Sequence, residues 1–449
     1  MKKVMLIQPP FTQPKQSKKR CIQPIGLTYV AGYLLSKNID VNILDCIVEG
    51  YYNETENNEN ITYGLSLENI KQKIIDEQPT HVGVSCMMSN QKHNTINVCK
   101  AIKKVDKTIT TFIGGVHASI CPNEMLLESS IDKVIVGEGE KSAYDAICSS
   151  NSILQSKQLD INTIPFPARK LTPMEDYFSI NMHRNIFSKN KRVVNIVTSR
   201  GCPFKCIFCC VTNFHGNWRG RKPDNVIAEI EQLVREYDVQ ELDIQDENFI
   251  INRERVIEIA KGIRKYNIQW LNPSGTWING LDEELIDVMY ESGCYQLTLP
   301  VETTNKKLLH TLVNKPIDFD KLRNIVNHCK KIGMLTHAYF VCGHPDQTRH
   351  DSIKDFAFAM DVGFDSATYN ILSPLQGSKL YEIYKNEIDV DNINFIKASI
   401  PHPEMQSNEL EFLVKNLNHD FNKSLCWRNP EAFKNKYGYN KKESIFERQ

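Results

Sequence analysis

The sequence lacks an excess of charge of either sign, a long apolar run and a paired arrangement of cysteines. Its 54 basic residues balance 54 acidic ones, so we expect no nucleic-acid partner held by bulk charge. No apolar run reaches the roughly 18–20 residues that cross a membrane, so we expect no membrane partner. The apolar start, residues 1–7, is too short for a signal peptide and predicts a first strand. We therefore expect a cytoplasmic protein, and 449 residues suffice for two or three domains.

Fourteen cysteines are many for a cytoplasmic chain, and most of them are scattered. Outside one short segment they show no spacing typical of a disulfide framework, so we interpret most as small buried apolar side chains. A cell poor in oxygen would tolerate so many thiols. We therefore expect an anaerobic setting.

The exception is a Cys-x3-Cys-x2-Cys segment formed by Cys202, Cys206 and Cys209, with Phe208 directly before the last cysteine. Three thiolates on one loop can hold three irons of a cubane 4Fe–4S cluster and leave the fourth iron open for chemistry. A ferredoxin would bring a fourth cysteine, and a zinc ribbon a second pair. A structural zinc site is the plain alternative.

The spacing, the preceding Arg200-Gly201 and the Cys-x-Phe-Cys ending together resemble the signature of the radical S-adenosylmethionine (SAM) enzymes. This resemblance implies that the open iron binds the amino and carboxylate groups of SAM. It also implies an external one-electron donor, such as flavodoxin or ferredoxin, for the cleavage of SAM to a 5′-deoxyadenosyl radical.

Residues 1–150 alternate short apolar runs with amphipathic stretches, which predicts a doubly wound parallel sheet of Rossmann-like α/β type. Strands are expected at 4–7, 41–44, 82–85, 111–113 and 134–136, and helices near 26–37, 66–77, 91–104 and 123–130. Ligands bind such sheets at the carboxyl ends of the strands, where glycines allow close backbone approach. Candidate binding residues there are Pro9, Ser85, Gly114, Gly115, His117, Gly137, Glu138, Gly139 and Glu140.

The Gly-Gly-x-His and Val-x-Gly-Glu-Gly-Glu loops, in this order, resemble the cobalamin-binding domain found ahead of many radical SAM cores. A flavodoxin-like domain with another ligand, or with none, is the alternative. The Asp-x-His-x-x-Gly pattern that places a histidine on cobalt is absent. The resemblance therefore implies that His117 lines the cofactor pocket without binding cobalt, and a loop histidine with an unrelated role is the alternative.

Three further segments complete the predicted organisation. Residues 151–190 are polar and punctuated by prolines, which predicts an extended linker. Residues 191–385 repeat strand and helix patterns, which fits a partial (β/α)6 barrel with the cysteines at the carboxyl end of its strands. Residues 386–449 predict a small helical cap.

Candidate SAM contacts follow the barrel strands. Asp246 and Glu247 resemble the family's acidic motif, and a carboxylate beside the cluster would accept from the SAM ammonium. Ser274, Glu302 and Phe340 occupy later elements that resemble SAM-contacting motifs, although Pro300 replaces the usual glycine before Val301-Glu302.

The roles of two further features have more than one interpretation. Cys210, next to the last cluster cysteine, is interpreted as a bystander. Arg219 or Arg221 could bind a phosphate or phosphonate. Binding to SAM or to protein carboxylates is an equal alternative for both arginines.

Over residues 1–385 the chain is identified as a member of the cobalamin-binding radical SAM family, whose assigned members are mostly methylases. This implies methylation of a small-molecule substrate, at an unactivated carbon or a phosphinate phosphorus, through methylcobalamin and the 5′-deoxyadenosyl radical. A cobalamin-dependent oxidoreductase or ring-forming enzyme without methyl transfer is the alternative, and a non-catalytic sensor a weaker one. The sequence does not identify the substrate.

Overall fold

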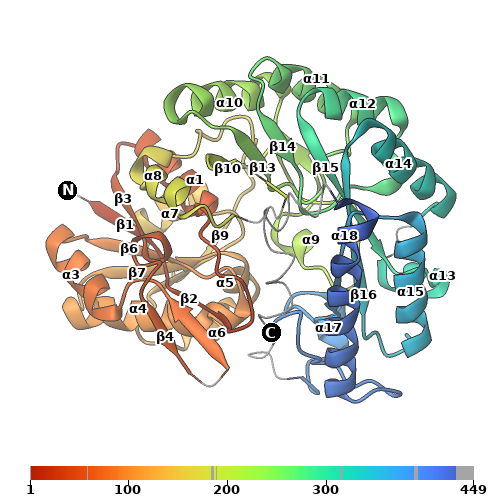
Figure 1. Ribbon diagram of the computed structural model, residues 1–449. Coiled ribbons are helices and arrows are strands. Elements are labelled where there is room, and N and C mark those ends of the chain that lie inside the picture. Colours follow the sequence, from red (N-terminus) through yellow and green to blue (C-terminus); the bar gives the residue numbers. More distant parts are fainter. Residues whose placement is uncertain are drawn as a thin grey trace.

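The computed structural model describes residues 2–430, except residues 58, 184–186, 189, 314–315 and 389–392. Two parallel sheets follow each other along the chain and face each other across the middle of the molecule (Figure 1). Within the described residues, no helix is both long and apolar enough to cross a bilayer.

The first sheet has six parallel strands in the order β3-β1-β6-β7-β8-β9. They are β1 (Lys3–Gln8), β3 (Asp40–Asp45), β6 (His81–Ser85), β7 (Thr110–Gly114), β8 (Lys133–Val136) and β9 (Ile153–Gln155). One face packs on α3 (Leu67–Glu77) and α4 (Lys92–Val105), and the other on α1 (Ile25–Ser36) and α7 (Gly139–Cys148). A sheet with helices on both faces confirms the predicted doubly wound fold.

Several elements of this half differ from the sequence prediction. The strand β9 and the helix α8 (Met174–Ile180) lie within the segment predicted as an extended linker. The backbone groups of β9 complete the sheet by pairing with β8, so this part of the segment is not free chain. A small antiparallel sheet of β2 (Phe11–Pro14), β5 (Asn60–Tyr63) and β4 (Glu54–Glu56) was not predicted. The remaining short helices are α2 (Cys46–Glu49), α5 (Val116–Ile120) and α6 (Pro122–Leu126).

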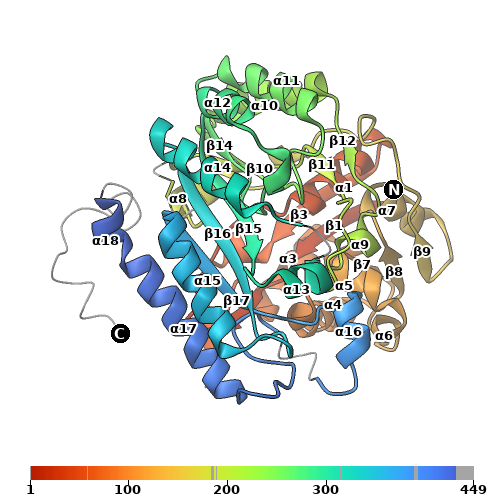
Figure 2. The same ribbon diagram turned by 90° about the vertical axis from the view of Figure 1, so that its right-hand side faces the viewer.

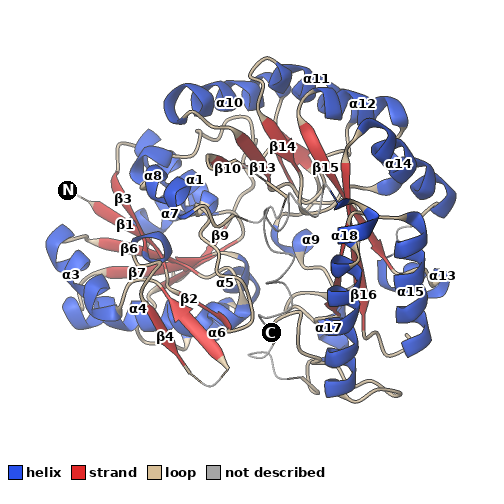
Figure 3. Ribbon diagram, in the orientation of Figure 1, coloured by secondary structure: helices blue, strands red, loops and turns tan. Residues whose placement is uncertain are grey.

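The second sheet has six parallel strands in sequence order and curves into an open partial barrel (Figure 3), which confirms that prediction. Its strands are β10 (Val193–Ile196), β13 (Glu241–Ile244), β14 (Gln269–Leu271), β15 (Cys294–Glu302), β16 (Leu335–Cys342) and β17 (Ser366–Ile371). The helices outside it are α10 (Pro223–Tyr237), α11 (Arg253–Arg264), α12 (Glu283–Glu291), α14 (Phe319–Ile332) and α15 (Arg349–Val362). The short helix α13 (Lys306–Leu308) continues as a π-helical turn, Leu309–Val313.

The barrel is followed by α16 (Lys379–Tyr384), α17 (Ser407–Lys423) and α18 (Leu425–Arg428). Helix α17 packs along β17 and α15 (Figure 2). Phe421 of α17 lies edge-on against Phe356 and Tyr369. The segment predicted as a helical cap contains α17 and α18 and an irregular stretch, residues 393–406, and its residues 389–392 and 431–449 lie outside the described residues. The predicted boundaries at residues 150, 190 and 385 stay predictions.

Candidate functional site

A cavity of about 290 Å³ lies between the two sheets, at the carboxyl ends of the strands of the first one. The first sheet contributes Ser85, Gly114, Gly115, Gly137, Glu138, Gly139 and Glu140 to its lining. The barrel side contributes Val197, Arg200, Phe214, His215, Gln245 and Glu247. The structure thus brings together most of the residues predicted on the first half with Glu247 of the second.

One end of the cavity continues into the first domain as an apolar slot between the sheet and helices α1 and α7. The slot is lined by Leu6, Leu27, Val30, Gly83, Phe112, Ile135 and Ala143. Gly83 in β6 packs closely on its neighbours, because a Cβ there would lie 2.5 Å from the Phe112 ring. A slot with apolar walls suits a flat, apolar part of a ligand.

The two glycines after β7 have different roles. Gly115 has a φ of +111°, and a Cβ there would lie 2.7 Å from the Cys86 carbonyl oxygen, so the turn itself requires glycine. At Gly114 a Cβ would meet only Ile135, at an ordinary 3.6 Å. Gly114 is therefore the position where the backbone leaves room for a ligand.

The carboxylates of Glu138 and Glu140 are buried and bind arginines of the barrel half. Arg200 lies 3.3 Å from Glu138 and donates to Glu140, while Arg219 donates to Glu138. His215 also contacts Glu138, with Nδ1 3.3 Å from the carboxylate. Burial alone would raise the pKa of Glu138, but hydrogen bonds from His215 and Arg219 and the charge of Arg200 lower it to about 2.

The three cysteines lie in a loop, residues 201–218, that connects the two strands of an antiparallel ribbon. The strands are β11 (Ser199–Arg200) and β12 (Arg219–Gly220), and short helix α9 (Val211–Phe214) lies within the loop. The Ile207 N–H donates to the Leu312 carbonyl at 2.8 Å, and the Ile207 carbonyl accepts from the Leu380 N–H at 2.8 Å. The barrel thus holds the loop from two sides.

The cluster cysteines are half-buried and close to one another. Burial raises the pKa of Cys209 to about 12, and the nearby thiols of Cys210, Cys206 and Cys202 add to the rise, although the Val211 N–H opposes it. A cysteine binds a metal as its thiolate, so iron bound by these neighbouring cysteines would displace their protons. Phe208 packs against the apolar group around Leu308 and Leu312, next to Cys206 and Ile207.

Asp246 and Glu247 differ in exposure. Asp246 is fully buried, and it accepts hydrogen bonds from the Thr198 N–H, the Thr198 hydroxyl and the Ser199 hydroxyl. It therefore ties β13 to the start of the cysteine loop and does not line the cavity. Glu247 lines the cavity and accepts from the Gly201 N–H at 3.1 Å. Burial raises the pKa of Glu247, and His215 opposes the rise.

The later predicted residues are spread over the barrel. Ser274 is exposed in the turn after β14. Glu302 ends β15 at a bulge and has a φ of +63°, a strained conformation for a side chain of this size and a common mark of functional sites. Phe340 stacks on Tyr369 at 4.9 Å in the core beneath α15 and α17. It therefore faces the helices and not the barrel interior, because side chains of a strand alternate between its faces.

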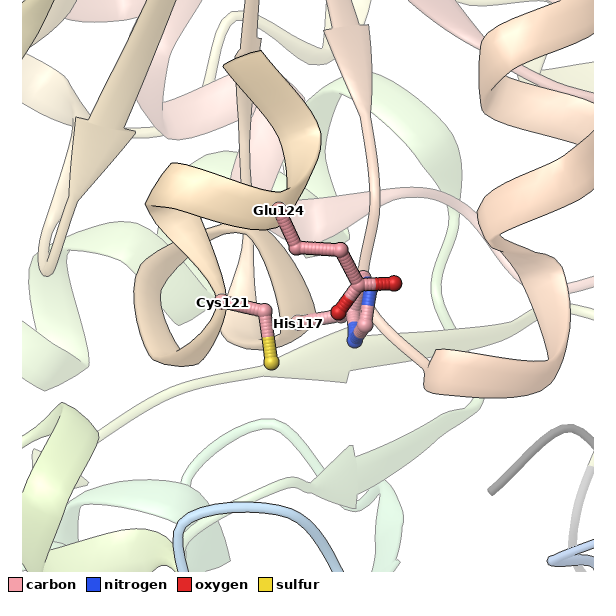
Figure 4. Close-up of side chains that lie close together, drawn as sticks. All are labelled: His117, Cys121 and Glu124. Atoms are coloured by element: carbon pink, nitrogen blue, oxygen red, sulfur yellow. The ribbon is translucent and has the colours of Figure 1, made fainter. Parts of the chain in front are cut away.

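His117 and Pro9 are buried but do not line the cavity. The Ser89 hydroxyl donates to Gln376 of the barrel half and lies 3.1 Å from His117 Nδ1, so this group bridges the two halves. His117, Cys121 and Glu124 place possible metal-binding atoms within 4.8 Å of one another (Figure 4). The Lys92 ammonium lies 3.1 Å from Glu124 and competes with a cation there.

The arginines that could have bound a phosphate are both engaged by protein carboxylates. Arg221 is buried and donates to Glu229 at 2.5 Å, and Arg219 donates to Glu138. The structure therefore favours the alternative in which both arginines bind protein carboxylates, and not a phosphate or phosphonate.

Sequence reasoning missed Arg200 and His215 as residues of the site. Arg200 was used only as part of a motif, and His215 carries no local pattern. The only signal was the position of both residues at the edges of the cysteine loop.

Comparison with known proteins agrees with this arrangement. Residues 17–147 match the B12 binding domain model, and residues 196–359 match the radical SAM superfamily model. Cytidylyl-2-hydroxyethylphosphonate methyltransferase of Streptomyces wedmorensis is 29% identical, over 94% of this chain and 90% of that protein. Anaerobic magnesium-protoporphyrin IX monomethyl ester cyclase of Rubrivivax gelatinosus is 25% identical, over 86% of this chain and 71% of that protein.

Among solved structures, the radical S-adenosylmethionine methyltransferase TsrM from Kitasatospora setae, with cobalamin and a [4Fe-4S] cluster bound, has the same fold. The TM-score is 0.66 at 16% identity, over 86% of this chain and 78% of that chain. The two family models occur in the same order as the two sheets. The first range contains the glycine-rich loops that line the cavity, and the second contains the cysteine loop. This chain belongs to the cobalamin-binding radical SAM enzymes.

Proposed function

We propose that this enzyme is a cobalamin-dependent radical SAM methyltransferase that methylates an unactivated carbon, or a phosphinate phosphorus, of a small molecule. The observation that carries the proposal is the cavity between the sheets, where loops of the cobalamin-binding half face the barrel half that carries the cysteine loop. When bound, SAM and a 4Fe–4S cluster supply a 5′-deoxyadenosyl radical, and methylcobalamin supplies the methyl group.

The residues present fit cobalamin. Gly114 leaves backbone space at the end of β7, and the apolar slot between the sheet and helices α1 and α7 suits the nucleotide tail of the cofactor. If the nucleotide tail occupies this slot, its base cannot also bind cobalt from below. His117 does not line the cavity, and both ring nitrogens of His215 face carboxylates. These contacts support binding without a protein ligand to the metal.

The residues present also fit the cluster and SAM. Cys202, Cys206 and Cys209 would hold three irons, and Cys210 would stay a bystander. Glu247 would accept from the SAM ammonium, because it is the carboxylate of the acidic motif that lies at the cavity. Asp246 would act by holding the barrel to the loop. Ser274 and Glu302 stay proposed SAM contacts, and Phe340 would act only by packing.

The two halves together would exclude water from the reacting centre. Arg200 and Arg219 bind Glu138 and Glu140 across the junction, so the cavity is closed by buried ion pairs on that side. Exclusion of water protects a radical from side reactions. A flavodoxin or ferredoxin as electron donor, an anaerobic setting and a cytoplasmic location remain parts of this proposal.

The substrate class is inferred from the relative that aligns along almost the whole chain. That relative is named for a cytidylyl phosphonate, and the alignment leaves little of either protein unmatched. We therefore propose a nucleotidyl phosphonate or a similar small phosphorus compound as substrate. The relative named as a cyclase keeps ring formation without methyl transfer as the second candidate.

One experiment separates the two candidates. The anaerobic enzyme, reconstituted with iron, sulfide and cobalamin, is incubated with SAM, a reductant and candidate phosphonates. Methylation predicts a product heavier by one methylene, together with 5′-deoxyadenosine and S-adenosylhomocysteine. A product that loses hydrogen and gains no methylene would favour the cyclase candidate.

A further inference from the structure

Glu138 reaches across the domain junction to the base of the cysteine loop. It belongs to the segment between β8 and α7 of the first half, and its side chain is only 5% exposed. Its carboxylate meets Arg200, Arg219 and His215, which all belong to the barrel half. Both carboxylate oxygens are used in these contacts.

The two arginines lie on the two paired strands that the cysteine loop connects. Arg200 in β11 and Arg219 in β12 lie directly opposite each other in the antiparallel register. Two like charges at opposite positions of a strand pair repel each other. Glu138 lies against both guanidinium groups, and together with Glu140 on Arg200 it offsets this repulsion.

A second line of contacts continues from Glu138 into the loop. His215 Nδ1 lies 3.3 Å from Glu138, and His215 Nε2 lies 3.3 Å from Glu247. Glu247 in turn accepts from the N–H of Gly201, the residue before Cys202. Gly201 has a φ of +84°, and a Cβ there would lie 2.5 Å from the Asn217 carbonyl oxygen, so the loop closes tightly at this point.

We propose that Glu138 of the cobalamin-binding half is a positioning residue for the cluster, because it clamps the Arg200–Arg219 ribbon that fixes the cysteine loop. The cluster geometry then depends on the docking of the first half, and the two cofactor sites are not independent modules. This inference rests on the cluster assignment within the proposed function, but not on methyl transfer.

The test compares Glu138→Gln with two other variants of the reconstituted full-length enzyme. Asp132→Asn is the matched control, since Asp132 precedes β8 and Glu138 follows it, and Asp132 pairs with Lys103 far from the ribbon. The double variant Glu138→Gln/Arg219→Gln removes one arginine together with the glutamate. Arg200 keeps its partner Glu140 in that variant.

The readouts are the paramagnetic resonance spectrum of the reduced cluster with SAM and the rate of 5′-deoxyadenosine formation. We expect Glu138→Gln to shift the spectrum and to slow SAM cleavage by roughly ten- to a hundredfold, because small displacements of reacting groups have effects of this size. We expect the double variant to regain most of the spectrum and rate, and Asp132→Asn to match the unaltered enzyme.

An unchanged spectrum and rate in Glu138→Gln would overturn the inference. A double variant whose spectrum and rate are as impaired as those of Glu138→Gln would also overturn it, because the proposed clamp acts by balancing charge. If Glu138→Gln does not fold, a folded double variant with normal values still supports the clamp. Absence of any cluster in the unaltered enzyme would instead remove the proposed function.

Discussion

The Glu247 carboxylate accepts a hydrogen bond of 3.1 Å from the backbone N–H of Gly201, directly before the first cluster cysteine. This bond connects the end of the second barrel strand with the start of the cysteine loop. Since Glu247 also lines the cavity that faces the first half, one carboxylate touches both parts of the site.

The cluster should depend on three cysteines and not on a fourth. Replacement of Cys202, Cys206 and Cys209 by alanine should abolish iron binding and SAM cleavage, because Cys210 is then the one thiol left in the loop and a single thiolate does not hold three irons. Iron and sulfide analysis and 5′-deoxyadenosine assays check this. Cys210→Ala is the matched control and should keep both properties; a cluster retained by the triple variant would refute the assignment.

Cobalamin binding should be sensitive to bulk at Gly114. Gly114→Phe should place a ring in the cavity and lower cobalamin binding at least tenfold, whereas Gly114→Ala adds only a Cβ at ordinary contact with Ile135. Absorption spectra after gel filtration measure the bound cofactor. Normal cobalamin content in Gly114→Phe would show that the cofactor lies elsewhere.

Gly115, the neighbouring glycine, is a poorer test position. A side chain there would meet the Cys86 carbonyl and would strain the turn whatever the ligand, because φ is +111°. Loss of cobalamin in a Gly115 variant would therefore not distinguish a blocked pocket from a damaged loop.

Cobalt should carry no nitrogen ligand from the protein. The paramagnetic resonance spectrum of the cob(II)alamin form should lack nitrogen superhyperfine splitting, since His117 lies outside the cavity lining and His215 contacts two carboxylates. A three-line splitting that disappears in His117→Ala or His215→Ala would contradict this expectation.

Asp246 should matter for stability because of its buried hydrogen bonds. Asp246→Ala leaves the Thr198 N–H and two hydroxyls without their acceptor, so we expect the free energy of unfolding to fall by about 3 kcal/mol. Urea unfolding followed by circular dichroism measures it. Asp106→Ala removes a similar but exposed acceptor and should lower stability by less than about 1 kcal/mol; equal losses would contradict the assigned role.

Much of the fold could be predicted from the sequence because the parallel strands are short, continuous apolar runs. The strand predicted at 134–136 and the helix predicted at 66–77 agree with β8 and α3. Strand β9 was missed because its segment is polar and rich in proline, and its place is set by pairing with β8 across the chain. Periodicity alone does not contain that information.

The site was predictable only where the chemistry is local. The three cysteines lie within eight residues, so their spacing can be recognised without knowledge of the fold. Glu138 contacts arginines of another domain, one of them 81 residues away along the chain, and these contacts carry no local sequence signal. Phe340 was predicted as a SAM contact, but a single residue cannot reveal which face of its strand it occupies.

The most direct test of the central claim is methyl transfer itself. The enzyme with cluster and cobalamin is incubated anaerobically with a nucleotidyl phosphonate and SAM labelled with deuterium in its methyl group, and the products are analysed by mass spectrometry. The account predicts a substrate that gains one labelled methyl group, and Gly114→Phe should abolish this gain while 5′-deoxyadenosine still forms. A labelled product formed equally by Gly114→Phe, or SAM cleavage with no methyl transfer to any phosphorus compound tried, would contradict it.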